Sequence, residues 1–212
     1  MSYRARFERL FAELRARPEV TVRVAEIGPP TPEPVIEAAR AVAAAAWPAG
    51  MAELYRELSS VDLEYSVAGS GGNGGGVHIP TVTDVWDHAG HEDELWFDWL
   101  VEESPDHPFT RIRPIDRFVP EAYAVLYSVP GDAPATVHYH YCGEELTPTG
   151  LSYEQWLERL FVARGATYWL QLAMGSSTKR TWVEENLERV AALFPDFVPS
   201  ALHPPRPFSP IA

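Results

Sequence analysis

Two histidines on one predicted strand are the first candidates for chemistry in this 212-residue chain. His138 and His140 stand two residues apart in a run of Val, Tyr and Thr, so a strand would place both side chains on one face. Such a pair can ligate a metal, and Glu144 or Glu145 follows closely. Hydrogen-bonded or solvent-facing histidines are the favoured interpretation, because the spacing fixes no third ligand.

A second candidate set lies further towards the N-terminus. Asp84, His88 and His91 have offsets that share one side of a helix, and aspartate and histidine together bind zinc or manganese. Gly90 interrupts that helix, and the chain has no H-E-x-x-H motif. We therefore expect structural or solvated residues here and no bound metal. The glycine-rich run 69–76 also lacks the residues of a phosphate-binding P-loop, and it is predicted to be a mobile hairpin or loop.

Acidic and aromatic residues alternate closely between positions 92 and 103. Aromatic side chains anchor protein interfaces and charge steers the encounter of partners, so this stretch is a candidate protein-binding face. The alternative is a helix with a buried aromatic side and a solvated acidic side. The candidate partner-binding residues are Glu92, Asp93, Glu94, Trp96, Asp98, Trp99, Glu102 and Glu103.

The charge balance restricts the class of partner. The chain has 30 acidic against 17 basic residues and a net charge of −13, which argues against nucleic acid or an anionic membrane and permits a basic protein. Its single cysteine, Cys142, excludes an internal disulfide and has no assignable general base. No apolar run reaches membrane length, and the N-terminus does not resemble a signal peptide. We expect a cytoplasmic protein without a cofactor.

His138 and His140 belong to a predicted unit of three strands and one helix, which must position them. Val, Ile, Tyr and Phe fill the strands, and short Pro, Gly and Asp turns connect them, which favours antiparallel pairing. Ser152 and Gln155 have capping-box spacing, and an apolar stripe from Tyr153 to Phe161 follows. The predicted strands are 111–118, 122–129 and 135–142, with turns at 130–134 and 143–150 and a helix at 152–165.

The rest of the chain adds helices and strands on both sides of this unit. The pattern predicts an α+β fold with a mostly antiparallel sheet flanked by helices. We expect a core domain over residues 34–175, an N-terminal helix and strand over 1–33, and a C-terminal helix with a proline-rich arm over 176–212. The other predicted elements are helices at 3–17, 35–46, 176–194 and one that starts at Pro48, and strands at 19–27 and 62–69.

The order of these patterns resembles the SUKH superfamily, which groups yeast cell-wall regulators with many bacterial immunity proteins. The likeness covers residues 34–174 and rests on pattern and order, without a catalytic signature. Trp47-Pro48 stands where family members usually have Leu-Pro before a second helix. The other matching residues are Arg113, Pro114, Ile115, Phe118, Val137, Tyr139, Ser152, Tyr153, Trp156, Leu157, Leu160, Gly165 and Trp169.

Three functions follow from these observations as hypotheses. The resemblance implies a non-enzymatic immunity protein that occludes a cognate toxin, and the acidic composition favours a basic toxin domain as the partner. The second hypothesis is a regulatory scaffold of the same fold with several weak partners. The third is a metal-dependent hydrolase that uses one of the two histidine sets. The partner's identity and the oligomeric state stay open.

Overall fold

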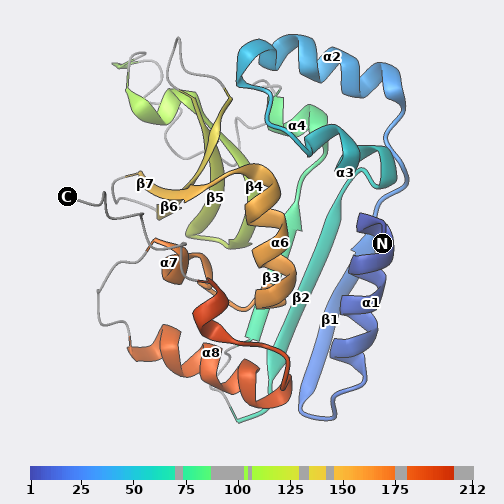
Figure 1. Cartoon of the computed structure of the whole chain (residues 1–212), viewed down its shortest axis with the longest axis vertical. Coiled ribbons are helices and arrows are strands. Elements are labelled where there is room, and N and C mark those ends of the chain that lie inside the picture. The colour runs from blue at the N-terminus through green and yellow to red at the C-terminus, as the bar shows by residue number, and fades with distance from the viewer. Residues whose placement is uncertain are drawn as a thin grey trace, which may run out of the picture.

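The computed structural model describes residues 1–69, 74–86, 103–104, 107–128, 134–141, 146–174 and 181–202. In these residues, helices surround two antiparallel sheets, so the predicted α+β class is confirmed (Figure 1). None of the helices in the described ranges is long and apolar enough to cross a membrane.

The first sheet has three strands, in the order β1 (Val20–Ile27), β2 (Val61–Val67) and β3 (Gly74–Ile79). β2 alternates strictly: Leu63 and Tyr65 are buried, whereas Asp62 is half-buried and Glu64 is exposed. One face of this sheet therefore meets the core and the other carries polar side chains. β1 pairs with β2 from end to end, so residues on both sides of position 33 share one sheet.

The second sheet has four strands that neighbour each other in chain order. Its first three strands confirm the predicted ones, but the fourth was predicted to be part of a turn. That prediction is wrong, because β7 pairs with β6 although it contains Pro148 and has Gly150 at φ 70°. The strands are β4 (Ile112–Val119), β5 (Ala122–Tyr127), β6 (Thr136–Tyr141) and β7 (Thr147–Leu151).

Helix α6 (Tyr153–Ala163) packs its aromatic face into the main core, where it contacts α1 (Tyr3–Arg15; Figure 1). The predicted capping box is present: the Gln155 backbone N–H donates to Ser152 Oγ at 3.2 Å, and Gln155 Oε1 accepts from the Ser152 N–H at 3.0 Å. Trp156 is fully buried. The helix ends at Arg164, which has a left-handed φ of 54°.

The remaining helices differ from the predictions mainly at their ends. α2 stops at Ala43 because Ala44 has φ 49°, and α3 begins at Met51, after Gly50 at φ 81°, instead of at Pro48. These elements are α1 (Tyr3–Arg15), α2 (Glu33–Ala43), η1 (Ala44–Ala46), α3 (Met51–Glu57), α4 (Val82–Trp86), η3 (Pro108–Arg111), α7 (Leu170–Ala173), α8 (Thr181–Leu193) and η4 (Pro199–Leu202).

A seam of hydrogen bonds joins β3 to the rest of the molecule. Gly76 N donates to Gly165 O at 2.9 Å, and Gly74 O accepts from Thr167 N at 3.0 Å. Further along β3, His78 N donates to the Asp116 carboxylate of β4 at 2.8 Å. We call these contacts of β3 with residues 165–167 and Asp116 the seam. Residues 74–76 form the start of β3 and pair with β2, so of the two predicted alternatives the loop is wrong for them.

Glycine is required in the seam because the backbones approach so closely. A β-carbon on Gly75 would lie 2.4 Å from Gly165 O and 2.4 Å from the ring of Tyr65. Neither the turn nor a buried ring can move without disturbing the core. The glycine run thus lets the turn after α6 bond to the edge of the three-stranded sheet.

Gly75→Ala should destabilise the protein by about 1–3 kcal/mol, the usual cost of overpacking a filled core. Urea denaturation measures the change. Ser66→Ala is the matched control on the neighbouring strand, because Ser66 is half-buried and should change the free energy of unfolding by no more than ~0.5 kcal/mol. A Gly75→Ala variant as stable as the wild type would contradict the close approach.

Candidate functional site

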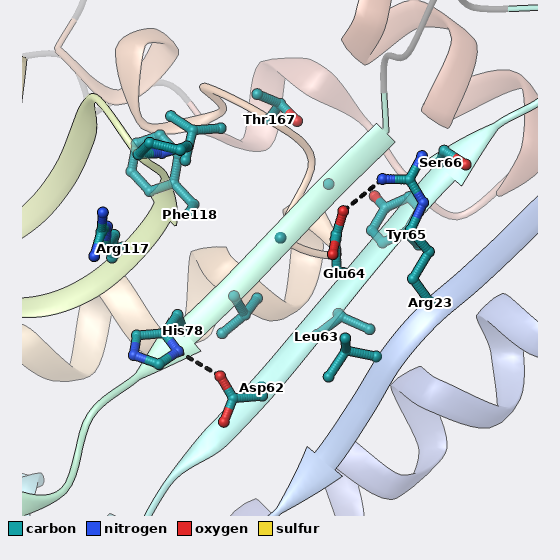
Figure 2. Close-up of a pocket in the computed structure, with 16 residues that line it drawn as sticks. Arg23, Asp62, Leu63, Glu64, Tyr65, Ser66, His78, Arg117, Phe118 and Thr167 are labelled. Atoms are coloured by element: carbon teal, nitrogen blue, oxygen red, sulfur yellow. Dashed lines mark hydrogen bonds and ion pairs between the residues drawn. The ribbon is translucent and has the colours of Figure 1, made fainter.

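A groove of about 520 Å³ lies over the polar face of the three-stranded sheet. This volume is within the range of about 300–1,000 Å³ that ligand sites usually occupy. Figure 2 shows Asp62 and Glu64 of β2 in its centre, with Arg23 of β1 on one side and His78 of β3 on the other. Its lining comes from four strands and the turn at Thr167, so only the assembled fold creates it.

Two side-chain pairs join neighbouring strands in this groove. His78 Nδ1 contacts Asp62 Oδ1, because the antiparallel register places these two residues directly opposite each other. Arg23 Nη1 lies 2.6 Å from Glu64 Oε1, and both side chains are more than half exposed. Exposed pairs contribute roughly 0–1 kcal/mol, so a binding partner could replace either contact at little cost.

The far wall of the groove is the end of β4. Arg117, Phe118 and Pro120 line it, and the Arg117 guanidinium lies 5.7 Å from the centre of the Tyr123 ring. Phe118 is buried and stacks on Tyr139 at 6.3 Å, which fixes the wall to the core. The groove therefore has a wall that Phe118 fixes to the core and a centre of charged, solvent-exposed side chains.

The groove contains the residue types of a Ser–His–Asp arrangement but not its spacing. His78 Nδ1 contacts Asp62 Oδ1 on the neighbouring strand. Ser66, which also lines the groove, is four residues from Asp62 along β2 and therefore about 13 Å away. No Ser–His–Asp arrangement is formed in the groove, and no cluster of three metal-ligating side chains occurs in the described part of the chain.

Asp116 of β4 is hydrogen-bonded to the groove strand β3, and no sequence pattern indicated this role. Its side chain is fully buried, and Oδ1 accepts the hydrogen bond from His78 N. Burial raises the pKa of Asp116 well above its ordinary value, while the hydrogen bond from His78 acts in the opposite direction. Oδ2 has no partner among the described residues, which fits a neutral carboxyl group. An acidic residue between Ile115 and Phe118 was the only signal in the sequence.

The two strand histidines share one face of the second sheet, as their spacing predicted. His140 is 1% exposed and lies edge-on to Phe109 with 4.7 Å between ring centres, and burial lowers the pKa of His140 to about 4. It is therefore neutral at pH 7. Burial also lowers the pKa of His138, whose ring lies 5.1 Å from that of Tyr127. Both rings contact a small second core that contains Val125.

The other predicted metal residues are placed only in part. Asp84 Oδ2 accepts from Thr81 Oγ1 at 2.6 Å at the start of α4, which is a helix-capping contact. His88 and His91 lie outside the described residues. The structure therefore brings no third ligand to Asp84 or to the strand histidines within the part of the chain that it describes.

The predicted partner-binding face also falls largely outside the described ranges. Glu103 is described and exposed. The remaining seven residues, Glu92, Asp93, Glu94, Trp96, Asp98, Trp99 and Glu102, lie outside them, so this face stays a prediction. The groove residues Asp62 and His78 were missed because only strand register, and no local motif, brings them together.

Comparison with known proteins adds no identification. No protein-family model matches the chain, and neither the curated proteins nor the solved structures contain a match. The likeness to the SUKH superfamily therefore remains a resemblance of sequence pattern, and the function has to be argued from the site.

The buried Asp116 predicts a specific dependence of stability on pH. Because its folded-state pKa lies above the unfolded value of about 3.9, its stabilising contribution is fully present below that value and is lost as the pH rises through the folded-state pKa. Asp116→Asn cannot ionise, so it should be more stable than the wild type at pH 8 and lose that advantage near pH 4. Urea midpoints at the two pH values measure this.

Ile115→Val is the control for this experiment, because Ile115 is buried next to Asp116 in β4 and does not ionise. Its effect on the free energy of unfolding should be the same at both pH values. If Asp116→Asn and the wild type had parallel stability profiles from pH 4 to pH 8, Asp116 would not be a neutral buried acid.

Proposed function

We propose that this protein is a non-enzymatic binding protein of the immunity type, which neutralises a cognate toxin by covering a basic surface on it. The observation that carries the proposal is the groove, where Asp62 and Glu64 lie on one side of β2 and pair with His78 and Arg23 of the neighbouring strands. The resemblance to immunity proteins of the SUKH superfamily supports the class of function. The net charge of −13 supports a basic partner.

The groove is proposed as part of the contact surface. Its centre holds the carboxylates of Asp62 and Glu64 two residues apart on β2, so both point to the same side of the sheet. A lysine or arginine of the toxin could replace Arg23 at Glu64 without leaving a buried charge behind, since that pair is exposed. The acidic and aromatic residues 92–103 are proposed as a second part of the same interface.

The proposal places the protein in the cytoplasm, where a toxin that attacks cellular targets would have to be intercepted. A single cysteine fits a reducing compartment. Occlusion requires no cofactor, because the complex itself blocks the toxin. Charge would raise the association rate, and desolvated contacts would slow dissociation.

Co-expression with the toxin domain encoded by the adjacent gene tests the proposal. We expect the chain to protect cells from the toxin and to form a one-to-one complex with a Kd of about 10 nM or less, which corresponds to about 11 kcal/mol. Isothermal titration calorimetry measures the stoichiometry and the Kd of the complex. Absence of protection and of binding would overturn the function, and several weak partners would instead support a regulatory scaffold.

Charge-neutralising variants test the contact surface separately. Asp62→Asn with Glu64→Gln should weaken toxin binding about 10-fold or more, about 1.4 kcal/mol. The control is Glu37→Gln with Glu53→Gln, which removes two exposed carboxylates from α2 and α3 and should change affinity less than about 2-fold. Equal affinity for both double variants would exclude the groove but leave the proposed function intact.

A further inference from the structure

A second pocket, of about 230 Å³, lies between the end of α2, the end of η3 and the start of β4. Val42 and Ala46 form its helical wall, and Val42 is 68% exposed at the rim. Trp86, at the end of α4, lines it as well and stacks on Trp47 at 6.0 Å between ring centres. Ser128 follows β5 and contributes a hydroxyl group.

The charge in this pocket has one sign. Arg111 and Arg113 both line it, and none of the described lining residues carries a carboxylate. This is unexpected in a chain with 30 acidic and 17 basic residues. A concave site with two guanidinium groups attracts anions, and its low-dielectric walls strengthen that attraction.

Arg113 is half-buried, and hydrogen bonds from its guanidinium go to main-chain carbonyls. Its Nη1 donates to Ile112 O at 2.8 Å and to Thr110 O at 3.4 Å, whereas Nε is buried and has no partner in the described part of the chain. No described carboxylate forms an ion pair with it. Burial lowers the pKa of Arg113, which reflects the cost of removing the guanidinium from water.

A buried arginine elsewhere in the chain shows how this protein compensates such a charge. Arg164 is 5% exposed, and its Nη2 lies 2.7 Å from both carboxylate oxygens of Asp196 and 3.5 Å from Glu13. Two carboxylates thus balance that buried charge. Buried charges are usually paired in this way, so a half-buried guanidinium beside a cavity points to a missing anion.

We infer that this pocket binds a single oxyanion, a phosphate or a carboxylate group, held by the guanidinium of Arg113. A planar guanidinium presents parallel N–H donors that match two oxygens of such a group. Ser128 also lines the pocket and offers a hydroxyl group as a further donor. At about 230 Å³ the pocket suits one group and not a whole nucleotide or coenzyme.

The oxyanion can come from two sources, a free phosphate or a carboxylate on another molecule, and both share the chemistry that Arg113 recognises. The test uses the full chain labelled with ¹⁵N. Sodium phosphate, sodium acetate and sodium chloride are titrated separately at matched ionic strength. We expect saturable binding of phosphate or acetate with a Kd in the millimolar range or below, a shift of the Trp86 indole N–H resonance, and no saturable response to chloride.

Variants assign the binding to this pocket. Arg113→Gln should weaken it 10-fold or more, and Ser128→Ala, which removes only a half-buried hydroxyl and should not disturb folding, about 3-fold or more. Arg56→Gln is the control, because Arg56 is an exposed arginine on α3 and should leave the Kd unchanged. Saturation by phosphate alone identifies a phosphate source, and saturation by acetate alone identifies a carboxylate source.

The inference fails if neither oxyanion saturates the wild-type protein. It also fails if Arg113→Gln and Ser128→Ala both bind as the wild type does. In either case Arg113 would only stabilise the main chain at the start of β4, through its hydrogen bonds to Thr110 O and Ile112 O. None of these results depends on the toxin-binding proposal, because no protein partner is present in the assay.

Discussion

The rest of the structure depends on how the edge strand β3 obtains hydrogen-bond partners for its outer backbone groups. An edge strand leaves a row of backbone groups unpaired, and burying them without partners would cost several kcal/mol. In this protein the turn at 165–167 and the Asp116 carboxyl provide those partners in place of a continuous ladder. Asn186 of α8 adds a further donor to Gly74 O at 3.2 Å. One short strand thus connects both sheets with α6 and α8.

The seam also explains where the groove lies. β3 forms its floor and the end of β4 forms its wall, and the seam holds the two at a fixed separation. On the buried side, burial raises the pKa of Asp116, which favours the uncharged form of its side chain. On the outer side, the charged residues of β1, β2 and β3 remain in contact with solvent and pair across the strands. A preformed face of this kind lowers the entropy that a partner would have to lose on binding.

The features that could be predicted from the sequence depend on local signals. The alternation of Val137 and Tyr139 predicted β6, and the spacing of Ser152 and Gln155 predicted the start of α6, because each pattern acts over a few residues. The shared face of His138 and His140 followed from the period of a strand. That Phe109 would cover His140 did not, because this contact joins distant parts of the chain.

What could not be predicted depends on tertiary contacts. The glycines at 74–76 look like a loop until the turn after α6 packs against them, and only then does the absence of side chains favour a strand. Asp62 and His78 are sixteen positions apart and meet only through the β2–β3 register. Asp116 was hidden for the same reason, since its burial follows from the meeting of two sheets and not from its neighbours in sequence.

Native-state hydrogen exchange of the amides of Gly76, His78 and Thr167 tests the role of the seam most directly. If these hydrogen bonds hold the two sheets together, the three amides should exchange only through global unfolding, as slowly as the amides in the core of β5 and with the same dependence on urea. Exchange of Gly76 and His78 at rates typical of a fraying edge strand, while β5 remained protected, would contradict that role and remove the rigid basis of the groove.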